Sequence, residues 1–583
     1  MPSGPRRSGL ATAAGLSGLA LLLRLKGLQD WPAWTDETGE IGTAVDIAFH
    51  GLRPLVHNDS YRGPLWAWLL AIPLRLLGPH AWLPRVFAAG IGALTVGAVW
   101  FLAARLAGRR AALAAALLAT TAFAPLVFFS HIAWSNHLTP LAVAVALLVS
   151  AWATRWPAEP GTVTDSGWSA ERMLLAGLAW GAALQTHPSA LLAFVGLAGW
   201  LAWRWTRRRL GGADRPAETA LPPNRVLLRA CLAAALGMGL ALSPVLAYNA
   251  RALLGSGQPT SVDEATDEDQ PVNRDLGPRI YLDNVVGLFG QLGRAAAAGP
   301  PWERGDPQPR GVAVLTDRLR PVVTVIACVL LLAALAWATR RPALALVAWP
   351  AWSTVLLLPL INRSYLNIYD ARYLGVLLLL GQVALGAWLA SEGGDQRAAT
   401  RDAGKAAATG GPPPGRSIGA PAWKALVLLF MLLYPLAAAT AYSQRAQDSG
   451  RVNGPLWVAL AALVRDRQGR TDLAPVLISR DLRDLDLGGG GDPARALGMM
   501  LSLEGQPVDT VKADTLGWYL GHSPGPLWVV VADRAVWPEP WHPQKLAWGP
   551  GWESLRVPGW QALRLERVAA DSPRSNDGSA ARP

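Results

Sequence analysis

Long apolar runs separated by short polar segments dominate the first three quarters of the chain. A helix that crosses a membrane needs about 20 consecutive, mostly apolar residues. Lipid offers no hydrogen-bond partners, so the backbone of such runs must pair internally, as a helix does. The pattern predicts an all-α polytopic membrane domain over residues 1–442, with about eleven transmembrane helices. The predicted spans are 9–28, 84–104, 111–129, 139–155, 172–187, 188–205, 226–248, 319–339, 342–361, 373–390 and 423–442.

One apolar segment, residues 64–78, is predicted not to cross. Its 15 residues would span about 22 Å as a helix, against roughly 30 Å of hydrocarbon. If it lies in the outer interface, with Trp66 and Trp68 at headgroup level, the basic clusters all fall on the cytoplasmic side. These clusters are Arg6 and Arg7, Arg105, Arg109 and Arg110, the run 204–209, Arg340 and Arg341, and the loop 391–422.

The predicted protein is therefore a multi-pass plasma-membrane protein with a cytoplasmic N-terminus. An apolar run follows Arg6 and Arg7 as in a signal sequence, but no small-x-small cleavage site follows, so the run is predicted to remain as the first span. The predicted outer regions are 29–83, 249–318 and the tail. The Gly-, Ala- and Pro-rich loop 391–422 is predicted to be disordered inside the cell.

The tail, residues 443–583, has a different pattern. Short β-type runs at 475–479 and 527–531, an alternating segment at 561–568 and a helical pattern at 493–504 predict a small extracytoplasmic α/β C-terminal domain.

Composition supports the membrane prediction. The chain is 51% hydrophobic and 16% charged, whereas soluble domains carry about 25% charged residues. Its net charge of +12 comes from short clusters between apolar runs, which is typical of membrane loops and argues against nucleic-acid binding. Cys231 and Cys328 both lie in apolar runs and are interpreted as packing residues.

The first outer loop, residues 29–83, carries the candidate chemistry. Asp36 and Glu37 begin a helical pattern that continues to about His50. Two adjacent carboxylates just outside a span are costly without a role. From spacing alone, an N-terminal cap with solvated surface charge is the favoured interpretation.

Four features in this order resemble the GT-C superfamily of membrane glycosyltransferases, which includes protein O-mannosyltransferases and lipid A aminoarabinose transferases. They are Asp36-Glu37, the stretch Arg62-Gly63-Pro64-Leu65, the run 85–102 and the basic hinge 103–110. The similarity covers residues 9–205 well, is weaker over 226–390 and is absent as motif from the tail. The resemblance implies that Asp36 is the catalytic base, or its equivalent, with Glu37 beside it.

The second outer loop departs from that family. Relatives often carry an acidic residue in the position that Asn136 or His137 occupies here. Neutral ligands hold hard cations poorly, which argues against a metal-dependent mechanism. No cofactor is predicted, and a divalent metal is left open.

When a sugar is carried on a lipid phosphate, the leaving group is the phosphate, which needs no protonation, so one carboxylate acting as base can suffice. The site then needs donors for the departing phosphate. Candidates are Arg62, His187 in an outer hairpin, and Arg372-Tyr373, which resembles an Arg-Tyr pair that contacts the carrier phosphate in relatives. His57 and Asp59 are candidate acceptor contacts. Helix-end or solvated roles remain alternatives for all of these residues.

Two stretches of the predicted outer region 249–318 also have recognisable patterns. The acidic stretch 263–269 lacks calcium-loop spacing and is interpreted as solvated loop. Residues 281–293 are predicted to form an interfacial helix.

The predicted function is an inverting glycosyltransferase that moves a sugar from a polyprenyl-phosphate donor to a glycan, lipid or protein acceptor on the outer face. A transporter or lipid flippase would need ionisable residues along a path in mid-membrane, and the later spans contain almost none. A non-catalytic envelope scaffold that binds through its tail is the third hypothesis.

Overall fold

The structure is a computed structural model of the 583-residue chain. It describes residues 4–28, 35–57, 61–157, 168–210, 224–255, 257–265, 277–301, 308–361, 372–391 and 420–448, and from the tail residues 476–479, 503, 508–511, 527–532, 548–557 and 560–567. The chain forms two compact units. The first comprises Met1–Leu28, Thr43–Leu76 and Pro84–Arg445, and the second comprises Gln29–Gly42, Leu77–Leu83 and Ala446–Pro583.

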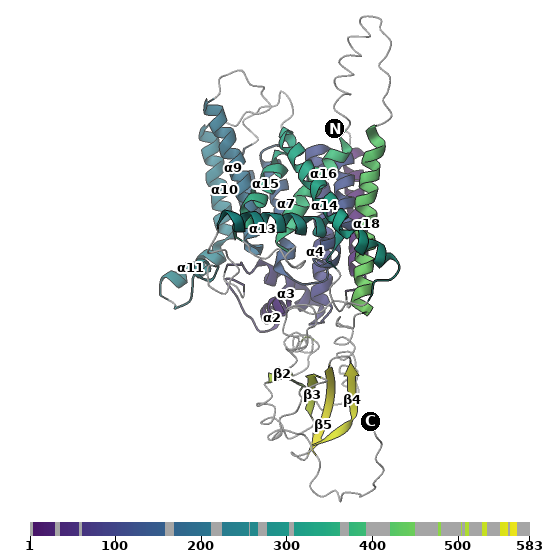
Figure 1. Cartoon of the computed structure of the whole chain (residues 1–583). Coiled ribbons are helices and arrows are strands. Elements are labelled where there is room, and N and C mark those ends of the chain that lie inside the picture. Colours follow the sequence, from purple (N-terminus) through teal and green to yellow (C-terminus); the bar gives the residue numbers. More distant parts are fainter. Residues whose placement is uncertain are drawn as a thin grey trace, which may run out of the picture. The chain divides into compact units, whose positions relative to one another are not determined.

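The first unit is built of helices that stand side by side (Figure 1). They are α1 (Gly4–Leu25), α3 (Leu65–Leu77), α4 (Leu83–Ala107), α5 (Arg109–Thr121), α6 (Phe123–Val127), η1 (Ser135–His137), α7 (Leu138–Ala153), α8 (Ala170–Thr186), α9 (Ser189–Leu210), α10 (Asn224–Ala241), α11 (Ser243–Leu253), α12 (Ser261–Ala265), α13 (Pro278–Gly293), η4 (Arg294–Ala298), α14 (Val312–Thr339), η5 (Pro342–Leu344), α15 (Ala345–Ile361), α16 (Gly375–Ala390) and α18 (Ala420–Asp448). The helix α2 (Thr35–Phe49) begins in the second unit and ends in the first.

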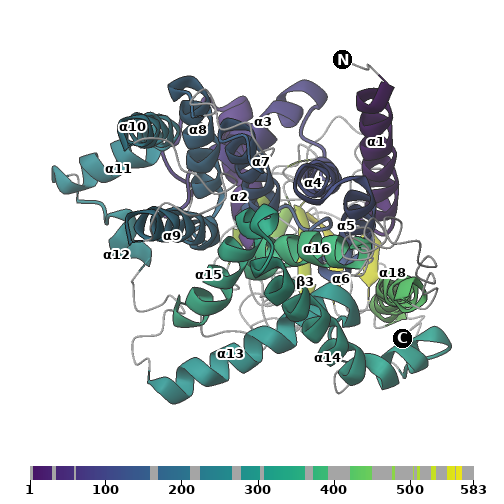
Figure 2. The same cartoon turned by 90° about the horizontal axis from the view of Figure 1, so that it is seen from above.

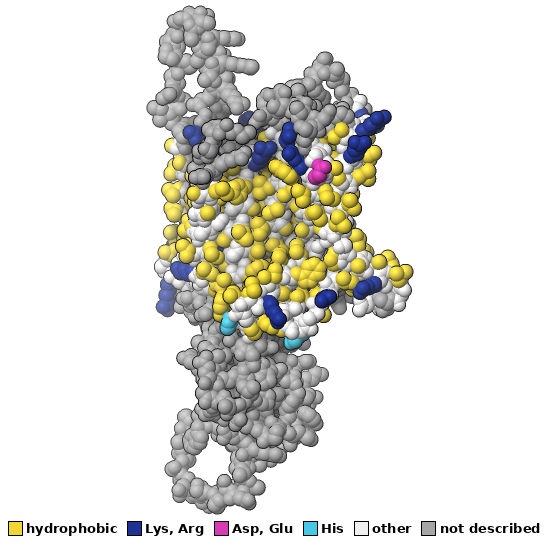
Figure 3. Space-filling model, turned by 180° about the vertical axis from the view of Figure 1, so that it is seen from behind, with side chains coloured by type: hydrophobic (Ala, Val, Ile, Leu, Met, Phe, Trp, Pro, Cys, Tyr) yellow, Lys and Arg dark blue, Asp and Glu magenta, His cyan; other side chains and the backbone are white. Residues whose placement is uncertain are grey.

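Seven helical stretches in the described part of the chain are long and apolar enough to cross a membrane. They are Leu83–Ala107, Ser135–Ala153, Asn224–Ala241, Val312–Thr339, Pro342–Ile361, Arg372–Ala390 and Ala422–Gln444. α1, α5, α8 and α9 also lie on predicted spans but are not among these seven. Apolar side chains cover the middle of one face of the molecule, with Lys and Arg side chains gathered at two margins (Figure 3). This distribution suits a bundle surrounded by lipid.

Two predicted spans are interrupted. The run 111–129 is divided at Ala122, whose backbone is extended, into α5 and α6. An unbroken helix would bring the Pro125 ring against the carbonyl of Thr121, whereas proline is tolerated in the first turn of a new helix. The run 226–248 is likewise divided near Leu242, and Pro244 stands in the first turn of α11.

The centre of the bundle is α16, which is buried at almost every position. It packs against α5, α14 and α15, and these helices surround it when the bundle is seen from above (Figure 2). A helix that is apolar on all sides is expected at such a central position. This helix was predicted as the span 373–390.

α8 and α10 approach each other through two glycines. A Cβ added at Gly177 would lie 1.9 Å from the carbonyl oxygen of Ala234, and one added at Gly237 would lie 2.1 Å from that of Leu174. Small residues allow such close backbone approach between helices in lipid.

We expect Gly177→Leu to separate these two helices and to destabilise the protein by about 1–3 kcal/mol. Gly199→Leu is the matched control, because nothing lies within 4 Å of a Cβ at that position. Thermal unfolding in detergent measures both variants. Equal unfolding temperatures would show that the close approach of α8 and α10 is unimportant.

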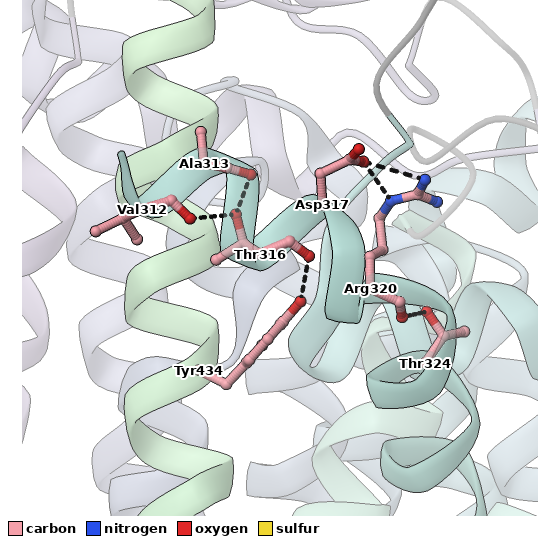
Figure 4. Close-up of polar contacts among 7 residues, drawn as sticks. All are labelled: Val312, Ala313, Thr316, Asp317, Arg320, Thr324 and Tyr434. Carbon is pink, nitrogen blue, oxygen red and sulfur yellow. Dashed lines mark hydrogen bonds and ion pairs between the residues drawn. The ribbon is translucent and has the colours of Figure 1, made fainter. Parts of the chain in front are cut away.

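α14 and α18 are joined by a buried hydrogen bond in which the Tyr434 hydroxyl donates to the carbonyl of Thr316 at 2.6 Å (Figure 4). One turn further along α14, Arg320 and Asp317 form an ion pair with an N–O distance of 3.3 Å. The two charged side chains therefore neutralise each other next to the apolar body of the helix.

Two helices of the first unit, α3 and α13, differ from the long helices of the bundle. α3 has 13 residues, or about 20 Å at 1.5 Å per residue, and that 64–78 does not cross stays a prediction. α13 runs crosswise to the neighbouring helices (Figures 1 and 2) and includes the predicted helix 281–293. Asn284 of α13 donates to the carbonyl of Pro359 at 3.0 Å, which holds α13 on α15.

The two tryptophans of α3 differ in burial. The side chain of Trp66 is fully buried, with its ring centroid 5.4 Å from that of Phe87, whereas Trp68 is exposed. The two residues lie on different faces of α3, and only one face is free.

In the second unit the described part of the tail is a five-stranded mixed sheet of β1 (Val476–Ser479), β2 (Val508–Val511), β3 (Leu527–Ala532), β4 (Trp548–Val557) and β5 (Trp560–Arg567). The strand order is β2-β1-β3-β5-β4. β1 pairs in parallel with β2 and β3, and β5 is antiparallel to β3 and β4. β1, β3 and β5 coincide with the predicted strands. Apart from Leu503, the helix predicted at 493–504 lies outside the described residues.

Candidate active site

The predicted catalytic pair stands in the first turn of α2. Asp36 is the second residue of that helix, and its side chain lies outside the described part of the structure. Glu37 is fully buried, and Glu40, one turn later, is 1% exposed. Buried carboxylates are costly unless polar groups meet them. This turn of α2 is therefore a buried acidic turn, which contradicts the alternative that Glu37 is solvated surface charge.

A second group of candidates gathers where α8 and α9 meet the first loop. The Arg62 guanidinium donates to the Ser135 hydroxyl at 2.9 Å. The next residue, Gly63, donates its backbone N–H to the carbonyl of Gln185 at 2.8 Å. The loop is thereby held on the end of α8, two residues before His187.

Arg372 lies between two aromatic rings. Its guanidinium carbon is 4.8 Å from the ring centroid of Trp134 and 4.9 Å from that of Tyr373, and it donates to the Tyr373 hydroxyl at 2.9 Å. Planar guanidinium groups stack well on aromatic faces. Arg372 is therefore held in a defined orientation.

His187 links these two arginines. Its ring centroid is 5.4 Å from that of Tyr373, and the positive charges of both Arg62 and Arg372 act on the His187 ring. The Nδ1 atom accepts the backbone N–H of Ser189 at 3.1 Å. In a neutral imidazole the remaining proton then sits on Nε2. His187 can thus donate a hydrogen bond without carrying charge.

The structure brings together four predicted phosphate-binding residues. We call Arg62, His187, Arg372 and Tyr373 the phosphate cluster. Two fixed guanidinium groups with a neutral N–H donor suit a phosphate, because charge-assisted bonds from arginine are strong and directional. The phosphate cluster belongs to the first unit, whereas Asp36 and Glu37 belong to the second.

The second-loop candidates are buried beside this cluster. Asn136 is 6% exposed and His137 is 4% exposed. The Nδ1 atom of His137 donates to the carbonyl of Ile132 at 2.7 Å, and its ring lies 4.9 Å from that of Phe129. These contacts indicate packing under Trp134, whose ring centroid is 5.5 Å from that of His137.

His57 is 4% exposed, which contradicts the solvated-loop alternative, and its ring nitrogens have no hydrogen-bond partner among the described residues. Burial, and secondarily the charge of Arg62, lowers the pKa of His57 to about 3. The backbone N–H of His57 donates to the carbonyl of Arg62 at 2.9 Å, so this neutral ring is tied to the loop of the phosphate cluster. Asp59, the companion candidate, lies outside the described residues.

This burial predicts acid sensitivity. The pKa of an unfolded histidine is about 6.5. Between pH 6.5 and about 3, His57 is therefore protonated in the unfolded chain but not in the folded protein. The free energy of unfolding should therefore fall as the pH falls through this window, by up to about 1.4 kcal/mol per pH unit.

His57→Gln should lose less stability than the wild type between pH 7 and pH 5, as thermal unfolding in detergent would show. His80→Gln is the control, because His80 is exposed. An identical pH dependence in wild type and His57→Gln would contradict a buried neutral histidine.

Sequence reasoning missed several neighbours of these residues. Trp134 and Ser135 hold Arg372 and Arg62, and Glu40 shares the buried face of α2. His131 is also buried, and its Nε2 atom lies 2.9 Å from the carbonyl oxygen of Lys26. The only available signal was the density of polar and aromatic residues between two apolar runs at 130–137.

Comparison with known proteins defines the class. Residues 61–212 match the family model described as dolichyl-phosphate-mannose-protein mannosyltransferase. No curated protein matches the chain by sequence. The matched segment contains Arg62, residues 130–137 and His187.

The fold is similar to that of ArnT from Cupriavidus metallidurans. The structure bound to undecaprenyl phosphate matches with a TM-score of 0.56 at 14% identity, over 96% of this chain and 98% of that one. The apo structure gives a TM-score of 0.54 at 14% identity over the same shares. The Archaeoglobus fulgidus oligosaccharyltransferase in the apo form has a TM-score of 0.46 at 13% identity, over 98% of this chain and 76% of that one.

The chain therefore has a helical fold similar to that of ArnT, and part of it matches a mannosyltransferase family model. More particularly, the predicted resemblance to the GT-C superfamily is confirmed, by the family match over residues 61–212 and by the fold shared with ArnT. The donor, the acceptor and the roles of individual residues go beyond these matches.

Proposed function

We propose that the protein transfers a sugar from a polyprenyl-phosphate donor to an acceptor on the outer face of the membrane, with inversion at the anomeric carbon. The observation that carries the proposal is the phosphate cluster. Two arginines fixed by Trp134, Tyr373 and Ser135 flank a neutral His187. Such a group fits a phosphate that gains negative charge as the bond to the sugar breaks. The similar protein ArnT has been crystallised with undecaprenyl phosphate.

In the proposed reaction Asp36 acts as the base. It takes the proton of the acceptor hydroxyl as the acceptor oxygen forms its bond to the anomeric carbon, and the bond from that carbon to the phosphate oxygen breaks. The electron pair leaves with the polyprenyl phosphate, which the phosphate cluster stabilises. A single displacement of this kind inverts the configuration.

The direct test is transfer in proteoliposomes with a radiolabelled polyprenyl-phosphate sugar and envelope extract as acceptor. Label should move to acceptor only when both substrates are present, and the product should have the opposite anomeric configuration by NMR. Movement of labelled lipid between leaflets without any acceptor would instead support the flippase hypothesis.

We also propose that the transfer needs no divalent metal. Asn136 and His137 are buried and neutral where relatives carry an acidic residue, and hard cations prefer carboxylate oxygens. The rate should stay within about twofold after treatment with EDTA. A large loss of transfer that Mg²⁺ or Mn²⁺ restores would contradict this part of the proposal.

A further inference from the structure

A cavity of about 540 Å³ opens among α7, α8, α9 and α10. On α8 it is lined from Met173 to Trp180, the half of the helix farther from His187. The cavity therefore lies toward the end of the bundle opposite the phosphate cluster. Its volume is within the range of about 300–1,000 Å³ that is usual for ligand pockets.

The wall of the cavity offers hydrocarbon rather than hydrogen bonds. Ser150 accepts the indole N–H of Trp180 at 3.1 Å and donates to the carbonyl of Ala146 at 2.7 Å. Thr154 and Trp156 also donate to backbone carbonyls. Because these lining groups already bond within the protein, a sugar would lose its hydrogen bonds with water here, whereas an apolar chain would lose nothing.

One end of the cavity is cationic. Arg204, which lines it, lies with its guanidinium carbon 4.8 Å from the ring centroid of Trp156 and 5.0 Å from that of Trp200. Arg105 donates to the carbonyl of Trp156 at 3.0 Å. Stacking on Trp156 and Trp200 keeps the apolar stem of Arg204 on the protein and places its positive charge at this end of the cavity.

The helices around the cavity also carry more positive than negative charge. The described helices α7 to α10 contain one acidic residue, Glu171, and several arginines. These arginines are Arg172, Arg204, Arg207, Arg208, Arg209, Arg225 and Arg229. They belong to the halves of α8, α9 and α10 that lie near the cationic end of the cavity.

We infer that this cavity binds an anionic phospholipid, with its phosphate at Arg204 and one acyl chain between α8, α9 and α10. A basic end on an apolar, membrane-embedded cavity matches both parts of such a lipid. The inference is independent of the proposed transfer reaction, because the cavity contains none of the residues assigned to the phosphate cluster or to Asp36.

The test uses the full-length protein reconstituted in nanodiscs of phosphatidylcholine with a minor share of phosphatidylglycerol. Native mass spectrometry then counts the lipids retained after gentle release. Arg204→Gln removes the charge, and Cys231→Trp fills the cavity from an exposed lining position. Arg279→Gln on α13 and Leu236→Trp on α10 are the controls, because both residues are exposed and neither lines the cavity.

We expect about fivefold less retained phosphatidylglycerol in Arg204→Gln and Cys231→Trp than in the two controls, a difference of about 1 kcal/mol. A phosphatidylglycerol probe with a photoreactive acyl chain should label peptides of α8, α9 and α10. Equal retention of phosphatidylglycerol in all four variants would overturn the inference. So would retention of phosphatidylcholine by the wild type at the same level as phosphatidylglycerol. Displacement of the probe by polyprenyl phosphate would also overturn it, because the cavity would then belong to the sugar carrier.

Discussion

Replacing Asp36 by asparagine should lower the rate of sugar transfer by about 10²–10⁴-fold, the contribution that a positioned general base usually makes. Asparagine keeps the size and most hydrogen bonds of aspartate but cannot accept the proton of the acceptor hydroxyl. Expression and membrane insertion should be unchanged, because the substitution is on one residue at the start of α2. Initial rates with saturating donor, normalised to protein amount, measure the effect.

Asp46→Asn is the matched control for this prediction. Asp46 lies on the same helix, its side chain is half exposed, and its carboxylate lies 2.9 Å from Nδ1 of His50. Its loss should leave the rate of transfer nearly unchanged. Full activity in Asp36→Asn would refute the assignment of Asp36 as the base. Labelling of Asp36→Cys from the cytosolic side would refute the proposal that position 36 lies on the outer face of the membrane.

The apolar runs predicted helices more reliably than they predicted unbroken spans. Hydropathy measures the composition of a segment, and 111–129 is apolar throughout. The break at Ala122 depends on one proline ring and one carbonyl, which composition does not register. The run 226–248 is divided near Pro244 for a similar local reason.

Short-range patterns also could not distinguish buried from exposed sides of an interfacial helix. Trp66 and Trp68 are two residues apart, so they point to different sides of α3. The side of α3 that packs on α4 depends on the tertiary structure, in which the ring of Trp66 contacts that of Phe87. The sequence therefore predicted the helix, but not which of its two tryptophans is buried.

The residues of the phosphate cluster could be predicted from their chemistry, but their arrangement in space could not. Arg62, His187 and Arg372 were each chosen as cations or donors on one side of the membrane, although more than 300 residues separate the first from the last. Their supports, Ser135 and Trp134, lie in a fourth segment. Such pairings depend on how α7, α8 and α16 pack, which no local pattern contains. Glu40 was missed because an acidic residue on a helix is normally solvated.

Replacing Arg372 by glutamine should lower kcat/KM for the polyprenyl-phosphate sugar by about 10²–10³-fold, comparable with the loss of one charge-stabilising donor in other acyl or phosphoryl sites. Arg372→Lys should give an intermediate loss. Lysine keeps the positive charge but cannot stack between Trp134 and Tyr373 or present the planar fork of donors that matches a phosphate. Arg279→Gln, on an exposed position of α13, is the control and should be nearly silent.

Inhibition by free polyprenyl phosphate, the product of the proposed reaction, separates phosphate binding from a structural role. Its inhibition constant should rise in Arg372→Gln and in Arg62→Gln, and the double variant should lose less than the product of the two single effects, because both guanidinium groups act around His187. Thermal unfolding reports any general damage. If both single variants keep the wild-type inhibition constant while transfer falls, the cluster does not hold the carrier phosphate, and the donor must bind elsewhere on the protein.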